Sequence, residues 1–231
     1  MQLSIVLPCF NEEANIAATI ADVDAWMQRR SITGEIIAVN DGSTDDTGVV
    51  LQHITASFRR LRVVTHPTNR GYGAAVRSGC DAVTTEWIGF MDSDGQFHTE
   101  DFDHLIRMSD DASIVVGRRR KRADPFMRKV NAKCFGFLSW LMLGVWARDV
   151  NCAMKIFRRD VWQRIRPTVA TGALFNAELF ARARKQGIAW AQVDVEHYPR
   201  QRGQQTGANP LVILRTLREL WVLRKLLARA L

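Results

Sequence analysis

Short apolar runs alternate with longer amphipathic segments through the first half of the chain. The apolar runs lie at residues 3–7, 35–39, 61–65, 87–91 and 113–116. Between them the pattern predicts helices, at about 12–30, 43–58, 69–84 and 101–108. Strands that alternate with helices pair in parallel and are covered by helices on both faces. The sequence therefore predicts an α/β fold with a mostly parallel sheet.

Three polar loops, each rich in hydrogen-bond acceptors, follow predicted strands at residues 8–12, 40–46 and 92–96. Ligands of open parallel sheets bind beyond the carboxyl ends of the strands, so we expect the loops to converge on one crevice. The third loop reads Asp-Ser-Asp-Gly-Gln. Asp92 and Asp94 offer the hard oxygen ligands that divalent metals prefer, and Gln96 can add a neutral one. A plain polar turn is the alternative interpretation.

Asn11 precedes Glu12 and Glu13 in the first of these loops. Asparagine caps helices well, and acidic residues suit the positive N-terminal end of a helix. The pattern therefore predicts that Asn11 caps the first helix. Taken alone, it favours a helix start over a functional site.

The chain has 231 residues and a net charge of +8. This length allows one large domain with a substantial core. The basic surplus indicates an anionic partner: a nucleic acid, a phosphate-bearing substrate or an anionic membrane surface. A basic nucleic-acid-binding protein is a low-ranked alternative, and we expect no nucleic acid as a partner, because the acidic loops would repel it and the sequence has no recognition motif for it.

Three further features bear on the compartment of the chain. The four cysteines lack metal-ligand spacing, which favours a reduced cytoplasmic protein over a zinc protein. Residues 1–7 predict a strand rather than a cleaved leader. The sequence has no uncharged apolar run of about 18 residues, so we expect no spanning helix.

Basic residues are concentrated between residues 117 and 133, and an uncharged apolar run follows at 134–147. A helix of this length is too short to cross a bilayer, so the run predicts either a core helix or one that lies on a membrane. An extended stretch is expected at 149–157, helices at 159–165 and 174–186, and a strand at 189–197. A basic polar loop is expected at 199–207. Residues 210–231 predict an amphipathic helix, which suits a membrane anchor or a dimer contact.

Four motifs together resemble the N-terminal half of a family 2 glycosyltransferase of GT-A fold. They lie at residues 3–13, 40–47, 69–79 and 92–96. Three later segments extend the resemblance to about residue 207, towards polyprenyl-phosphate sugar transferases of the dolichyl-phosphate mannose synthase type. They are Gly117-Arg118, the stretch 149–157 and the loop from Pro199. The resemblance implies a GT-A (Rossmann-like) domain at 1–209, followed by the C-terminal amphipathic helix at 210–231.

The resemblance implies an inverting hexosyltransferase that takes a sugar from a GDP- or UDP-linked donor. The nucleotide-sugar pocket would be lined by Pro8, Phe10, Glu12, Val39, Asp41, Asp92 and Ser93. Within it, Asp41 would lie against the base. Asp92, Asp94 and Gln96 would hold Mg²⁺ or Mn²⁺ on the diphosphate, where a metal neutralises the charge that grows on the leaving group.

The implied acceptor is a polyprenyl (dolichyl-type) phosphate at the cytosolic membrane face, which makes the protein cytoplasmic and peripheral on the membrane. This acceptor is already an anion, so the task is to hold two phosphates together, and arginines do so with bidentate hydrogen bonds. The candidates are Arg118, Arg128, Arg200 and Arg202. Asp94, Arg118 and Arg202 are expected to be catalytic. The same donor chemistry with a soluble or polysaccharide acceptor is the alternative.

Two positions depart from the family pattern. Asn40 stands where the family often has Asp, and we expect it to be structural only. Residues 204–206 read Gln-Gln-Thr where close relatives often have a lysine.

Asp149 is expected to bind the sugar, to orient the acceptor arginines or to cap a strand.

Overall fold

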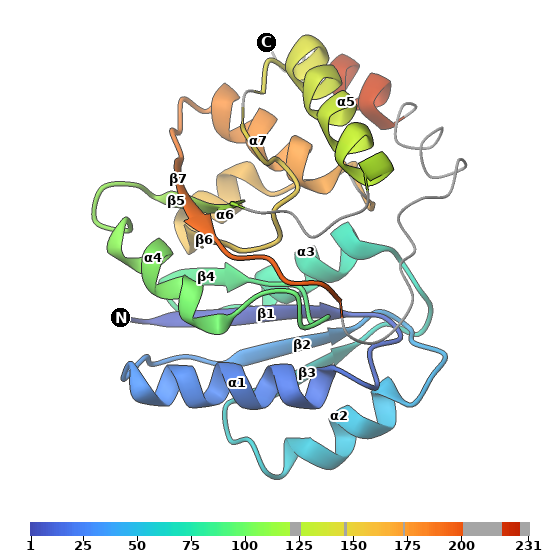
Figure 1. The fold of residues 1–231 in the computed structure, drawn as a ribbon, viewed down its shortest axis with the longest axis vertical. Helices are drawn as coiled ribbons and strands as arrows, with labels where there is room; N and C mark the ends of the chain where they lie inside the picture. The colour runs from blue at the N-terminus through green and yellow to red at the C-terminus, as the bar shows by residue number, and fades with distance from the viewer. Residues whose placement is uncertain (121–125, 146, 173, 201–218, 227–231) are drawn as a thin grey trace.

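The computed structural model describes residues 1–120, 126–145, 147–172, 174–200 and 219–226, with the backbone alone for 126–134. A seven-stranded sheet runs through the molecule (Figure 1) in the order β3-β2-β1-β4-β6-β5-β7. The strands are β1 (Leu3–Cys9), β2 (Ile36–Asn40), β3 (Leu61–Thr65), β4 (Trp87–Phe90), β5 (Ile114–Arg119), β6 (Lys155–Arg158) and β7 (Ala191–Val195). Only β6 runs antiparallel to its neighbours, β4 and β5, among these strands. The predicted mostly parallel α/β sheet is confirmed.

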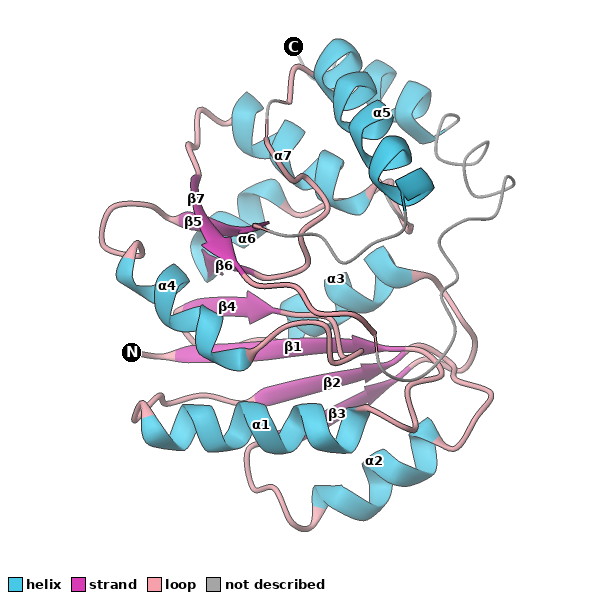
Figure 2. Cartoon of the chain, in the orientation of Figure 1, coloured by secondary structure: helices cyan, strands magenta, loops and turns pink. Residues whose placement is uncertain are grey.

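Helices cover both faces of the sheet (Figure 2). They are α1 (Ile16–Arg29), α2 (Thr47–Thr55), α3 (Tyr72–Ala82), α4 (Phe102–Arg107), α5 (Phe126–Leu143), α6 (Arg159–Ile165) and α7 (Phe175–Lys185), with a 3-10 turn at Thr99–Asp101. One core cluster joins the sheet to α1, α2 and α4, and the other joins it to α3, α6 and α7. The central strands are buried on both faces, which is why they read as continuous apolar runs.

The helix after the basic stretch begins earlier than predicted, at Phe126 rather than near residue 134. Leu143 is buried in the core, whereas Phe137 and Leu141 are exposed. One side of the apolar run therefore packs inwards, as predicted for a core helix, and the other side faces outwards. That the outer side lies on a membrane stays a prediction. Of the predicted C-terminal helix at 210–231, residues 219–226 are described and are helical, and Leu220 and Leu223 join the same core. The boundary at residue 209 stays a prediction.

The predicted cap of the first helix is wrong. Helix α1 begins at Ile16, after Asn15, and Asn11 lies outside it with a positive φ of 57°. Asparagine tolerates this left-handed conformation better than most residues. The side chain of Asn11 instead accepts a hydrogen bond from the backbone N–H of Thr44 (2.8 Å). Asn11 thus joins two loops of the carboxyl edge of the sheet.

Helix α3 packs closely on the sheet at Gly79, where a Cβ would lie 2.3 Å from Cγ1 of Val6. We expect Gly79→Ala to lower the free energy of unfolding by about 1–3 kcal/mol, because the branched Val6 side chain cannot move aside easily. Gly136→Ala in α5 is the matched control, since a Cβ there meets nothing within 4 Å. Urea denaturation of both variants would measure the difference. Equal losses at the two positions would contradict this packing.

Candidate active site

The Asp-x-Asp loop at residues 92–96 follows β4 at the carboxyl edge of the sheet. Ser93 is buried, and its hydroxyl donates a hydrogen bond to the carbonyl of Pro8 (2.8 Å). The carbonyl of Ser93 accepts one from the hydroxyl of Thr19 in α1 (3.2 Å). The backbone N–H of Gln96 donates to Oδ1 of Asp94 (3.1 Å). These bonds fix the loop against β1 and α1.

The loops after β1 and β2 are joined to each other, as the sequence predicts for loops at one edge of the sheet. The backbone N–H groups of Asn11 and Glu12 donate to the hydroxyls of Ser43 (3.0 Å) and Thr47 (2.8 Å), respectively. Asn40 accepts a hydrogen bond from the backbone N–H of Ser43 (3.0 Å), and this contact agrees with its expected structural role.

Asp41 is buried at the end of β2, and its carboxylate is fully engaged by the loop that follows β3. Its Oδ1 lies 2.6 Å from Nδ1 of His66 and accepts a hydrogen bond from the backbone N–H of Arg70 (3.0 Å). Its Oδ2 accepts one from the N–H of Gly71 (2.8 Å). Asp41 therefore shapes the start of α3. Its predicted contact with the base stays a prediction.

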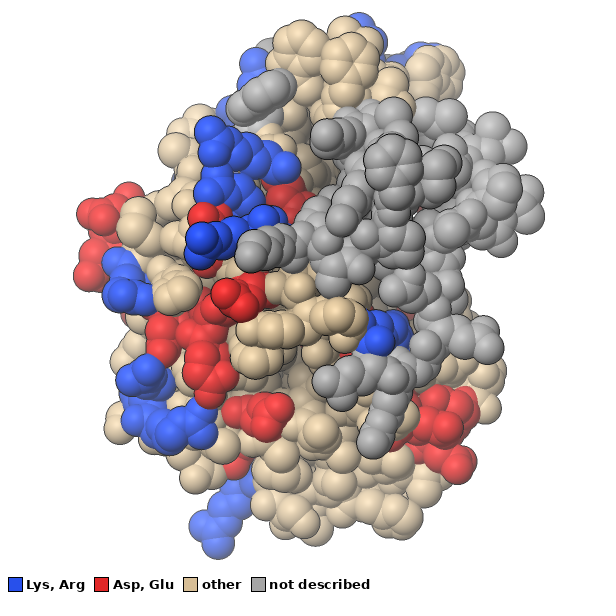
Figure 3. All heavy atoms as spheres, viewed as in Figure 1, with Lys and Arg blue, Asp and Glu red and all other residues tan. Residues whose placement is uncertain are grey.

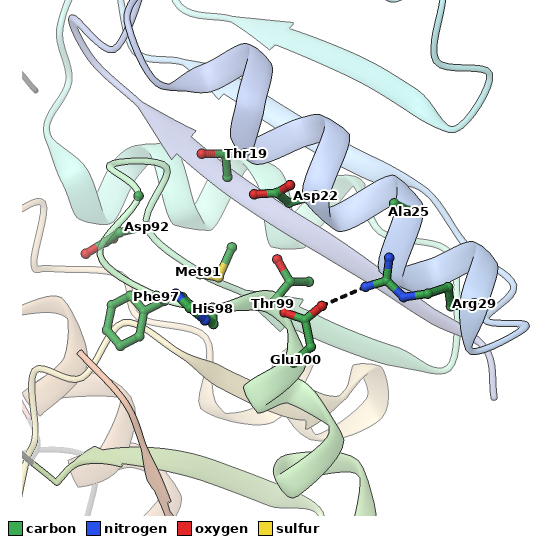
Figure 4. Close-up of a pocket in the computed structure, with 11 residues that line it drawn as sticks. Thr19, Asp22, Ala25, Arg29, Met91, Asp92, Phe97, His98, Thr99 and Glu100 are labelled. Carbon is green, nitrogen blue, oxygen red and sulfur yellow. Dashed lines mark hydrogen bonds and ion pairs between the residues drawn. The ribbon is translucent and has the colours of Figure 1, made fainter. Parts of the chain in front are cut away.

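A pocket of about 320 Å³ lies between α1 and residues 91–100. In Figure 4, Asp92 lies at one end of this pocket and the ion pair of Arg29 with Glu100 (2.6 Å) at the other. Thr19 and Asp22 form the α1 wall. The pocket leaves open volume directly beside the Asp-x-Asp loop.

Behind Asp92 the structure buries a lysine that the sequence analysis missed. Lys155 of β6 is fully buried, and its ammonium donates hydrogen bonds to Oδ1 of Asn176 (3.0 Å) and to the carbonyl of Cys152. The ring of Phe90 lies 5.0 Å from the ammonium. Burial lowers the pKa of Lys155 to about 8, although nearby carboxylates, including that of Asp92, act in the opposite direction.

The two carboxylates of the Asp-x-Asp loop repel each other. Burial, and after it the negative charge of Asp94, raise the pKa of Asp92 to about 7, whereas Arg119 and Lys155 oppose the rise. A bound cation would relieve this repulsion. In the described part of the chain, no group of three or more His, Cys, Asp or Glu has the arrangement of a metal site. Mg²⁺ needs only one or two protein carboxylates when phosphates and water complete its shell, so Asp92 and Asp94 fit a metal shared with a diphosphate.

The two neighbouring arginines at the end of β5 have different surroundings. Arg118 donates through Nε to Asp194 on β7 (2.6 Å), in a partly exposed ion pair. Arg119 makes a bidentate pair with Asp149 (2.7 and 2.8 Å), and these two side chains are only 7% and 8% exposed. The arginine that faces inwards, near Asp92, is therefore Arg119, which the sequence analysis did not select. Consecutive strand residues point to opposite faces, so Arg118 and Arg119 face different sides of the sheet.

The structure places the other predicted site residues as follows. Arg200 pairs with Glu12 (2.5 Å) and Asp94 (3.6 Å). Gln96 donates through Nε2 to the carbonyl of Tyr198 (3.0 Å), and its role as a metal ligand stays a prediction. Pro8 and Val39 are buried, and Phe10 is exposed. The side chains of Arg128 and Arg202 lie outside the described residues.

Acidic and basic side chains are intermixed on the face drawn in Figure 3. The ion pairs of the site agree with this pattern, since Arg118, Arg119 and Arg200 each contact a carboxylate. These arginines can bind a phosphate group only if a phosphate oxygen replaces a carboxylate oxygen as their partner.

The family model described as glycosyl transferase family 2 matches residues 4–166. A dodecaprenyl-phosphate galacturonate synthase of Rhizobium johnstonii is 31% identical over 170 residues, covering 72% of this chain and 50% of the relative. A dolichyl-phosphate beta-glucosyltransferase of Trichomonas vaginalis is 28% identical over 211 residues, covering 84% of this chain and 63% of the relative. The chain thus spans about half to two thirds of the length of these curated relatives.

A solved structure with a similar fold is glucosyl-3-phosphoglycerate synthase of Mycobacterium tuberculosis, in complex with Mn²⁺, UDP-glucose and phosphoglyceric acid. It superimposes with a TM-score of 0.74 at 20% identity, over 97% of this chain and 80% of that one. At this identity the likeness shows the fold, and it confirms the predicted GT-A architecture. The matched family model covers well over half of the sequence, including all three loops of the site. The chain therefore belongs to glycosyl transferase family 2.

Proposed function

We propose that this protein transfers a sugar from a nucleotide-sugar donor to a polyprenyl phosphate. Family membership supports sugar transfer, and the names of the two relatives support a polyprenyl phosphate as the acceptor class. The observation that carries the proposal is the charge arrangement at the carboxyl edge. Two adjacent carboxylates lie there beside the cationic groups of Arg119, Lys155 and Arg200. This arrangement suits a reaction that brings two phosphate groups and a metal together.

The donor half of the site consists of the edge loops of β1, β2 and β4. We infer that the GDP or UDP moiety lies across Pro8, Phe10, Glu12, Val39 and Asp41, with its diphosphate at the Asp-x-Asp loop. Asp92 and Asp94 would hold Mg²⁺ or Mn²⁺ there, and the bound metal supplies charge neutralisation for the departing diphosphate. The bonds of Ser93 to β1 and α1 hold the loop in place for this task.

The acceptor half is the basic side of the site. A lipid phosphate is ionised at neutral pH, so the protein has to position it rather than deprotonate it. Arg119 is fixed by Asp149 and lies near Asp92, and Lys155 adds a second buried charge. Attack from the face opposite the diphosphate would invert the anomeric centre. Arg118, Arg128 and Arg202 remain acceptor candidates.

The exposed side of α5 supports a membrane-surface location. Phe137 and Leu141 are 58% and 60% exposed and lie four residues apart, on one face of the helix. In the C-terminal helical segment Trp221 is exposed, and the ammonium of Lys225 lies 3.4 Å from the centre of its ring. Exposed aromatic side chains beside basic ones are typical of helices that lie in the membrane interface. Among the described helices, none is both long and apolar enough to cross a bilayer.

Replacement of the exposed α5 side chains tests this location. We expect Phe137→Ser combined with Leu141→Ser to weaken binding to anionic phospholipid vesicles by about tenfold or more, because two half-exposed apolar side chains no longer enter the interface. Val49→Ser on α2 is the matched control, since Val49 is 50% exposed on another part of the fold. Vesicle sedimentation measures the binding. Equal binding by all three proteins would contradict a membrane role for α5.

A donor panel tests the function itself. GDP-mannose, UDP-glucose, UDP-N-acetylglucosamine and UDP-galacturonate would each be offered with polyprenyl phosphate and Mn²⁺. We expect one donor to give an organic-extractable product that EDTA abolishes and added Mn²⁺ restores. Failure of every donor to label the lipid, or transfer to soluble acceptors alone, would overturn the proposal. The latter result would favour the alternative acceptor class.

A further inference from the structure

The segment that follows β7 crosses back over the Asp-x-Asp loop. The backbone N–H of Tyr198 donates to the carbonyl of Gln96 (2.9 Å), and the Gln96 side chain donates back to the carbonyl of Tyr198 (3.0 Å). The ring of His98 stacks on that of Tyr198 with 4.1 Å between the centroids. These three contacts hold residues 196–200 against the chain at Gln96 and His98, and they position Arg200 at the edge of the sheet.

Arg200 spans two carboxylates that come from different strands. Its Nη2 lies 2.5 Å from Oε1 of Glu12, after β1, and its Nη1 lies 3.6 Å from Oδ2 of Asp94, after β4. The three side chains are only 13%, 9% and 14% exposed. Glu12 is itself held in place, because its Oε2 accepts a hydrogen bond from Asn15 (2.8 Å). The guanidinium therefore already occupies a carboxylate that a metal held by Asp94 would need.

We propose that Arg200 is the resident cation of the donor site in the metal-free protein, and that the divalent metal displaces it from Asp94. The two cations compete for the same carboxylate oxygens, and the metal carries the higher charge. The displaced guanidinium stays close to the site through its anchored segment and can then contact a phosphate. This last step rests on the proposed function, whereas the competition at Asp94 does not.

The displacement implies an order of binding. Before the metal and the nucleotide enter, Arg200 is engaged with Glu12 and Asp94 and has less capacity for an acceptor phosphate. After they enter, its positive charge becomes available beside the diphosphate. The metal–nucleotide complex should therefore bind first, and the acceptor phosphate second.

Mn²⁺ binding without nucleotide or acceptor tests the competition, with free Mn²⁺ followed by electron paramagnetic resonance. We expect Arg200→Met to bind Mn²⁺ about fivefold more tightly than the wild type, since loss of a competing ion pair has this size of effect. Arg200→Lys keeps a positive charge beside the carboxylates, so it should bind Mn²⁺ less tightly than Arg200→Met does. Arg60→Met is the matched control, because Arg60 pairs with Asp24 (3.4 Å) near the opposite edge of the sheet. Unchanged or weaker Mn²⁺ binding by Arg200→Met would overturn the proposal.

The wild-type protein gives an independent readout. The Nε–H resonance of Arg200, assigned by its absence in Arg200→Lys, should shift when Mg²⁺ is added. No shift at saturating Mg²⁺ would overturn the displacement, even if Arg200→Met failed to fold. Neither measurement uses a sugar or a lipid. Tighter Mn²⁺ binding without any lipid product would refute the proposed function alone, and lipid product with unchanged Mn²⁺ binding would refute the displacement alone.

Discussion

Asp94→Asn is expected to lower kcat/KM for sugar transfer by about a thousandfold, the upper range for loss of one group that stabilises a developing negative charge. Asp94 pairs with Arg200 (3.6 Å) and is one of the two carboxylates in the Asp-x-Asp loop. An amide in its place removes the charge that a divalent metal requires. The effect should appear as a loss of kcat at saturating donor, measured over a range of Mn²⁺ concentrations.

Asp22→Asn is the matched control for this prediction. Asp22 lies on the α1 wall of the pocket beside the same loop, but it belongs to no predicted ligand set. We expect its activity and its Mn²⁺ dependence to stay near those of the wild type. Full activity of Asp94→Asn at ordinary Mn²⁺ concentrations would exclude Asp94 as a metal ligand.

Breaking the buried pair of Arg119 with Asp149 should have the largest effect on stability. Arg119→Met leaves a buried carboxylate without its cation, and Asp149→Asn leaves a buried guanidinium without its anion. Each single change is expected to lower the free energy of unfolding by about 3–5 kcal/mol. The double variant buries neither charge, so it should lose much less than the sum of the two. Urea denaturation of all four proteins measures this coupling.

Asp194→Asn provides the comparison with an exposed pair. Asp194 contacts Arg118 at nearly the same place in the sheet, but its side chain is 44% exposed. We expect this change to cost less than about 1 kcal/mol, because water screens the pair. Equal losses for Asp194→Asn and Asp149→Asn would contradict the view that Arg119 is the arginine held in the interior.

The sequence predicted the fold well because its central strands are short, apolar and separated by clear helical patterns. It predicted residues 149–157 as extended, which is wrong for their first part: 148–151 form a turn, and the strand β6 begins at Lys155. It also did not predict that β6 runs antiparallel. Strand direction depends on the long connection through α5, and no local pattern encodes it. The cap assigned to Asn11 was wrong because its partner, Thr44, lies in another loop.

The three edge loops were predictable because parallel strands of one sheet bring their carboxyl ends together. The inward position of Arg119 was not predictable from the sequence. A run of three arginines does not reveal which one faces inwards, and its partner Asp149 is 30 residues away. Lys155 was missed because an isolated lysine in a strand usually indicates an exposed position. Arg200 and Glu12 are 188 residues apart, and only the folded chain brings them together.

Transfer to a lipid phosphate is tested most directly by an acceptor comparison with the donor that the panel selects. Labelled donor and Mn²⁺ would be supplied with polyprenyl phosphate, with the matching polyprenol or with glycerol 3-phosphate. We expect label in the organic phase with polyprenyl phosphate alone, because the site has cations for a phosphate oxygen and no need for a general base. Equal labelling of the polyprenol, or preferential labelling of glycerol 3-phosphate, would contradict a lipid phosphate as the acceptor.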